Sequence, residues 1–169
     1  MSLHQKISLL VRGPRTREDD YLRYMAEKDS LEEKLFAGEI SSSEELNRRN
    51  AEIEREYKGK VHASDCHLFE DEKELYHFLR TYTPFGEETV RATVEHERAH
   101  YEAAKALGVQ GQYGCWLLRQ KENDRLVCFQ AFVRFSNTVT LLREVLPTIV
   151  LAPEDPSSYD KKQANFCKS

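Results

Sequence analysis

The chain has 169 residues, of which 32% are charged, and its net charge is −4. This length predicts one soluble domain with its own core, and the mixture of acids with Lys and Arg leaves no basic stripe for nucleic acid. No apolar run approaches the roughly 18 residues of a membrane span, and no signal-peptide cleavage site is present, so we expect a cytoplasmic protein. The four cysteines form no C-x-x-C pair, which argues against a zinc knuckle or a redox dithiol.

The first part of the chain predicts one strand followed by two charged helices. The strand is expected over 6–12. Helix formers then fill 17–37 before Gly38, and a second polar helix over 44–58 ends at Gly59. We expect a solvated helical hairpin on a small core. The alternative interpretation is an arm through which the chain binds a protein partner.

A strongly predicted helix lies in the middle of the sequence. It follows a short extended segment over 60–69, a helix over 70–83 and the break at Pro84-Phe85-Gly86. Glu87 and Glu88 occupy its first turn, and Gly108 comes just after its end. These signals predict a helix over 87–107.

The remaining pattern predicts a hairpin and two more helices. Aromatic and aliphatic residues fill 112–120 and 126–135, which a polar turn separates. A helix over 138–146 is expected to stop at Pro147, and Ser157 can cap a short helix in the tail. The sum is an α+β fold, mostly helical, with a small antiparallel sheet packed on the helix 87–107.

Residues 96–100 read His-Glu-Arg-Ala-His, which is an H-E-x-x-H pentad. Two histidines at i and i+4 on a helix point the same way, so His96 and His100 can both reach one Zn²⁺. Glu97 then lies beside a metal-bound water as general base. We expect a metal-site core over about 60–150 in a single domain 1–169 that also carries the helical hairpin at about 17–58.

The helical wheel of 87–107 separates a polar face from the pentad. The polar face collects five charged residues: Arg91, Glu95, Arg98, Glu102 and Lys105. His96, Glu97 and His100 lie away from it, on the side of Val90 and Val94. Burying three titratable groups is costly unless each has a partner, and one metal ion with its water would satisfy all three. The alternative is that both histidines are core residues hydrogen-bonded to the backbone or to Glu97.

Over about ten residues, the pentad helix resembles the active-site helix of zincin metalloproteases. The resemblance implies that His96 and His100 bind zinc and that Glu97 activates water for attack on a peptide carbonyl, so the expected substrate is a peptide or protein. The metzincin extension H-E-x-x-H-x-x-G-x-x-H is absent, because positions 103 and 106 are both Ala. A gluzincin-type third ligand is a Glu on a downstream helix, and Glu144 is the candidate for it.

Three alternatives stay open. Another third ligand is possible, because five potential ligands precede the pentad helix: His62, Asp65, Cys66, His67 and His77. The repeats Glu74-x-x-His77 and Glu97-x-x-His100 match the paired motifs of di-iron bundles, although the offset of only 23 residues (97 − 74) leaves no room for the intervening helix. Finally, the chain could be a non-catalytic interaction domain whose pentad is a structural metal site or binds no metal.

Overall fold

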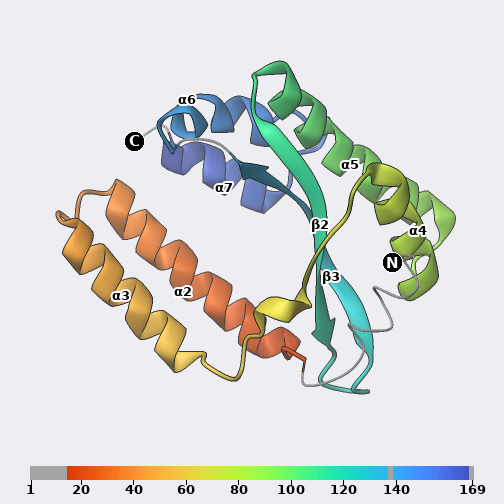
Figure 1. The fold of residues 1–169 in the computed structure, drawn as a ribbon, viewed down its shortest axis with the longest axis horizontal. Coiled ribbons are helices and arrows are strands. Elements are labelled where there is room, and N and C mark those ends of the chain that lie inside the picture. Colours follow the sequence, from red (N-terminus) through yellow and green to blue (C-terminus); the bar gives the residue numbers. More distant parts are fainter. Residues whose placement is uncertain (1–14, 137–138, 168–169) are drawn as a thin grey trace. The chain divides into compact units, whose positions relative to one another are not determined.

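The computed structural model describes residues 15–136 and 139–167 and confirms an α+β fold that is mostly helical, with a small antiparallel sheet (Figure 1). The expected strand over 6–12 lies outside the described residues. Among the described helices, none has the length and apolar character needed to cross a membrane. In chain order the elements are α2 (Glu18–Phe36), α3 (Ser43–Glu56), the 3-10 turn η1 (Ala63–Asp65), β1 (Cys66–Leu68), α4 (Glu72–Tyr82), α5 (Glu87–Ala106), β2 (Gln110–Arg119), β3 (Leu126–Ser136), α6 (Val139–Val150) and α7 (Ser158–Cys167).

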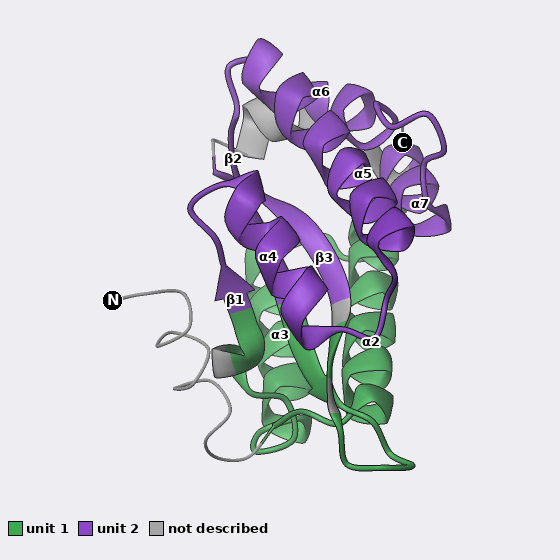
Figure 2. Cartoon of the chain, turned by 90° about the vertical axis from the view of Figure 1, so that its right-hand side faces the viewer, with its two compact units in different colours: residues 1–66, 116–129 green, residues 67–115, 130–169 purple. Residues whose placement is uncertain are grey.

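The chain divides into two compact units, which Figure 2 distinguishes by colour. The first comprises residues 1–66 and 116–129 and contains α2 and α3. The second comprises residues 67–115 and 130–169 and contains the four helices from α4 to α7. The three strands, in the order β1-β2-β3, contribute residues to both units.

In the first unit, α2 and α3 pack against each other as the expected helical hairpin. Gly38 has a φ of +78°, a left-handed conformation that ends α2 and suits glycine. The Ser42 hydroxyl accepts a hydrogen bond of 3.1 Å from the N–H of Glu45 and so caps α3. The apolar side chains of this unit gather in a small cluster: Leu31, Ile40, Ile53 and Tyr57, with Tyr24, Leu46 and Val61 packed against it.

In the second unit, α5 lies between α4 and α6, and it packs against both. Its bounds match the predicted helix within one residue, and all five charged residues of the predicted polar face are exposed. Val90, Val94 and Ala104 are buried on the opposite side. Leu107, which follows the last residue of α5, is 38% exposed.

The prediction that α6 would stop at Pro147 is wrong, since the helix continues through Pro147 to Val150. A proline inside a helix removes one N–H donor and costs about 3 kcal/mol. Ile149 and Val150 are almost fully buried, and each such side chain contributes roughly 1.5–3 kcal/mol, which offsets that cost. Leu151 N–H donates a 3.2 Å bond to the Pro147 carbonyl, so the helical bonding resumes after the ring.

At Gly114, the backbone of β2 is in close contact with Phe132 and with the backbone of His67. A Cβ atom at this position would lie 2.6 Å from the ring of Phe132 and 2.9 Å from the carbonyl oxygen of His67. Next to it, Phe69 N–H donates a 2.8 Å hydrogen bond to the carbonyl of Tyr113. A glycine at position 114 therefore lets the chain before α4 and the β3 side chain pack directly on the backbone of β2.

Candidate metal centre

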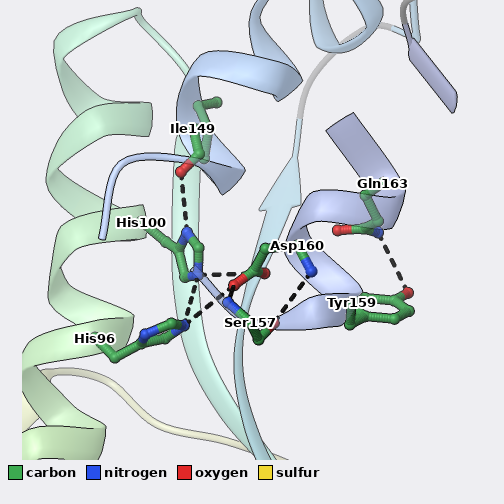
Figure 3. A network of polar contacts seen from close by, with 7 residues as sticks. All are labelled: His96, His100, Ile149, Ser157, Tyr159, Asp160 and Gln163. Atoms are coloured by element: carbon green, nitrogen blue, oxygen red, sulfur yellow. Dashed lines mark hydrogen bonds and ion pairs between the residues drawn. The ribbon is translucent and has the colours of Figure 1, made fainter. Parts of the chain in front are cut away.

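Three side chains from α5 and α7 meet within the second unit: His96, His100 and Asp160 (Figure 3). One potential ligand atom from each lies within 4.8 Å of the others, so the group could hold a metal ion. The histidines come together because residues four apart on a helix share a face. Asp160 comes from the first turn of α7, which packs against α6.

The Nε2 atoms of both histidines and the two oxygens of the Asp160 carboxylate approach one another at distances near the ligand spacing of a tetrahedral ion. Zinc–ligand bonds of 2.0–2.1 Å at tetrahedral angles place the ligand atoms about 3.3 Å apart. Here Nε2 of His96 lies 3.2 Å from Nε2 of His100 and 3.3 Å from Oδ2 of Asp160. Nε2 of His100 lies 3.5 Å from Oδ1 of Asp160. Both imidazoles and the carboxylate therefore converge closely enough to hold one metal ion.

A hydrogen bond to the backbone of α6 fixes the orientation of the His100 ring. Its Nδ1 lies 2.9 Å from the carbonyl oxygen of Ile149, which can only accept, so Nδ1 carries a proton. In the neutral ring, Nε2 is then a bare lone pair that faces His96 and Asp160. A purely structural histidine could make the same bond to Ile149. However, Nε2 of His96 and Oδ1 of Asp160 both lie near Nε2 of His100, and such a group of lone pairs favours binding of a cation.

A reciprocal pair of hydrogen bonds at the start of α7 holds the Asp160 carboxylate. Ser157 N–H donates to Oδ2 of Asp160 at 2.8 Å, and Asp160 N–H donates to the Ser157 hydroxyl at 3.1 Å. This is the geometry of a capping box, with an acid three residues after the capping serine. The predicted cap at Ser157 is confirmed, and its partner is the acid that faces the two histidines.

The surroundings of Asp160 and His100 favour the charged form of each side chain. Burial by itself would raise the pKa of Asp160, yet hydrogen bonds from His100 and Ser157 outweigh it and lower the pKa to about 2. Burial by itself would lower the pKa of His100, but its bonds to Asp160 and to the Ile149 carbonyl outweigh it and raise the pKa. Without a metal ion, protonated His100 and ionised Asp160 therefore stabilise each other.

Glu97 is buried beside this group, with 7% of its surface exposed. Burial raises its pKa to about 8, while His100 acts to lower it and Asp160 to raise it. A metal-free site therefore keeps Glu97 largely protonated at neutral pH, because the positive charge nearby is too weak to offset desolvation. A divalent cation at the centre would favour its ionised form.

Solvent reaches the group on one side. The His96 side chain keeps 27% of its surface exposed, compared with 7% for His100 and 10% for Asp160. Three protein ligands with a solvent-facing side are typical of catalytic zinc sites, whereas structural sites are closed by a fourth protein ligand.

The structure does not bring Glu144 into this group. Glu144 lies exposed on α6, and Asp160 supplies the carboxylate in its place. Asp160 also lies beyond the range 60–150 that was expected to hold the metal-site core. Its sequence signal was available as Ser157-x-x-Asp160, a capping-box pattern that predicts a helix start but says nothing about a metal.

The other candidate ligands have different surroundings. Asp65 is fully buried in the first unit, where it accepts a 2.7 Å bond from Thr16 N–H and pairs with Arg15 Nε at 3.4 Å. His67 packs its ring on Phe69, with centroids 4.9 Å apart. Within the described residues, the ligand group includes none of the upstream candidates His62, Asp65, Cys66, His67 and His77, and it excludes Glu74 of the di-iron interpretation.

Comparison with known proteins adds no relative. No protein-family model, no curated protein and no solved structure matches this chain.

Proposed function

We propose that this chain is a zinc-dependent hydrolase that cleaves peptide bonds. His96, His100 and Asp160 would hold the zinc ion, and Glu97 would be the general base. The observation that carries the proposal is the convergence of two imidazoles and one carboxylate beside a buried glutamate that follows the first histidine. The two Nε2 atoms lie 3.2 Å apart, and the Asp160 carboxylate approaches His96 through Oδ2 at 3.3 Å and His100 through Oδ1 at 3.5 Å. Two imidazoles and one carboxylate form a ligand set that zinc accepts in catalytic sites.

The residues divide the chemistry between them. Bound zinc supplies Lewis acidity that lowers the pKa of water. The Ile149 carbonyl keeps the proton of His100 on Nδ1 and its lone pair on Nε2, which fixes the ring for coordination. Glu97 takes a proton from the attacking water and returns it to the leaving amine, as a general base that becomes a general acid.

The exposure of the metal centre to solvent at His96 favours a catalytic role for it over a structural one. A substrate carbonyl would approach past His96, which is the most exposed of the three ligands.

The α2–α3 hairpin does not enter this proposal, and its binding of a protein partner stays a prediction.

Metal analysis combined with a peptidase assay tests the proposal. We expect near-stoichiometric zinc in the wild type and in Glu97→Gln, and its loss in His96→Ala. Cleavage of a fluorogenic peptide mixture should require both zinc and Glu97. Glu95→Gln is the matched control, because Glu95 is exposed on the same helix and should change neither property.

Two outcomes would contradict the proposal. Wild-type protein that takes up no zinc, even after zinc loading, would remove its basis. Zinc-loaded protein that cleaves no peptide, or that cleaves equally well as Glu97→Gln, would leave a metal centre without the proposed catalysis and favour the non-catalytic interaction domain.

A further inference from the structure

The carboxylate of Asp160 belongs both to the candidate metal centre and to the capping turn of α7. It faces both histidines, and it accepts the hydrogen bond from Ser157 N–H that closes the first turn of α7. In return, the Asp160 N–H donates a hydrogen bond to the Ser157 hydroxyl, so the two residues hold each other (Figure 3). A change in this turn therefore changes the position of the carboxylate.

The hydrogen bonds distinguish the two carboxylate oxygens. Oδ2 accepts the 2.8 Å bond from Ser157 N–H and lies 3.3 Å from His96, whereas Oδ1 lies 3.5 Å from His100. An aspartate without such a bond can rotate about its side-chain torsions. The bond from Ser157 N–H to Oδ2 restricts this rotation and keeps Oδ2 beside His96 and Oδ1 beside His100.

We propose that Ser157 is a positioning residue of the metal centre. It does not contact the ion itself, but it holds Asp160 in the orientation that completes the ligand set. The inference rests on the proposed metal binding, and it adds that the N-terminal turn of α7 and the metal centre form and loosen together. Partners that orient a metal ligand in this way commonly account for 10–100-fold in metal affinity.

Thermodynamic linkage between metal binding and the N-terminal turn of α7 allows a second test, by hydrogen exchange. If the turn supports metal binding, then metal binding must support the turn by the same free energy. We therefore expect zinc to slow hydrogen exchange at the amides of Ser157 and Asp160, both of which donate within the turn. The amide of Glu45, which donates to Ser42 in the cap of α3, should exchange at an unchanged rate.

Zinc affinity, measured by competition with a chromogenic chelator on the full-length chain, tests the inference directly. Ser157→Ala removes the hydroxyl and should weaken zinc binding by roughly tenfold. Ser157→Pro also removes the N–H that binds Oδ2, so its loss should be larger. Ser157→Thr restores the hydroxyl and should return most of the affinity.

Ser42→Ala is the matched control. It deletes the same kind of serine cap from α3 in the first unit, where Ser42 accepts from Glu45 N–H. We expect it to lower thermal stability as a lost helix cap does, with no change in zinc affinity. A purely structural role for Ser157 would make Ser157→Ala behave like Ser42→Ala.

The outcomes separate the inference from the proposed function. Wild-type and Ser157→Ala proteins that bind zinc equally tightly would overturn the role of Ser157 and leave the metal site standing. Wild-type protein that binds no zinc would overturn both. If Ser157→Pro fails to fold by circular dichroism, the comparison of the Ala and Thr variants still decides the matter.

Discussion

Nδ1 of His100 donates a hydrogen bond of 2.9 Å to the carbonyl oxygen of Ile149, in the last turn of α6. That carbonyl is available because the final carbonyls of a helix lack partners four residues later in the same helix. The continuation of α6 past Pro147 is what places it there. A helix that ended at Leu146 would leave the back of the imidazole without this acceptor.

Zinc binding should weaken steeply as the solution becomes acidic. The pKa of His100 is raised, so a proton competes with the metal for Nε2 already above the ordinary histidine value of 6.5. Below that raised pKa, each competing proton lowers the apparent zinc affinity by about tenfold per pH unit. Chelator competition between pH 5.5 and 8 measures this dependence. An affinity that does not change over this range would contradict coordination by His100.

Asp160, and not Glu144, should control metal uptake. Asp160→Asn removes the charged ligand and should lower zinc affinity by at least about tenfold. Glu144→Gln makes the same chemical change at an exposed position on α6 and should have no effect. Elemental analysis after dialysis compares the two variants. Equal zinc content in both would show that the carboxylate on α7 is not a ligand.

The metal-free protein should lose stability as the pH rises from about 4.5 to about 8. Glu97 has a folded pKa of about 8 and a model value of 4.5. Well below pH 4.5 it is protonated in both folded and unfolded chains, so its titration does not affect the free energy of unfolding. As the pH rises, the unfolded chain ionises first, and the free energy of unfolding falls by at most about 1.4 kcal/mol per pH unit.

Glu97→Gln removes this dependence because glutamine stays neutral at every pH. Urea unfolding of chelator-treated protein at pH 5 and pH 8 gives the comparison. We expect the wild type to lose more stability than Glu97→Gln between the two values. Parallel losses in both proteins would place the titrating group elsewhere.

Gly114→Ala should destabilise the second unit. Its methyl group would clash with the Phe132 ring and with the His67 carbonyl oxygen, and overpacking of this kind costs about 1–3 kcal/mol. Gly86→Ala is the control, since a Cβ there meets nothing within 4 Å. Urea midpoints measure both changes. A Gly114→Ala protein as stable as Gly86→Ala would contradict the close packing.

The sequence predicted the parts of this fold that local patterns determine. Helix periodicity and the glycine after its end defined α5, and the i, i+4 spacing placed His96 and His100 on one face, away from the exposed charges. Asp160 could not be predicted as their neighbour, because its approach depends on how α6 and α7 pack. Pro147 misled the prediction of α6 because a local helix breaker was outweighed by burial of residues that follow it.

The position of Asp160 in the sequence also affects how the proposed metal centre can assemble during synthesis. Asp160 follows His100 by sixty residues (160 − 100), so the pentad emerges from the ribosome well before the acid that completes the group. A nascent chain that ends within α6 has two histidines but no third ligand, and it lacks the capping turn. If the three residues bind a metal ion together, as proposed, its tight uptake has to wait until translation has passed α7.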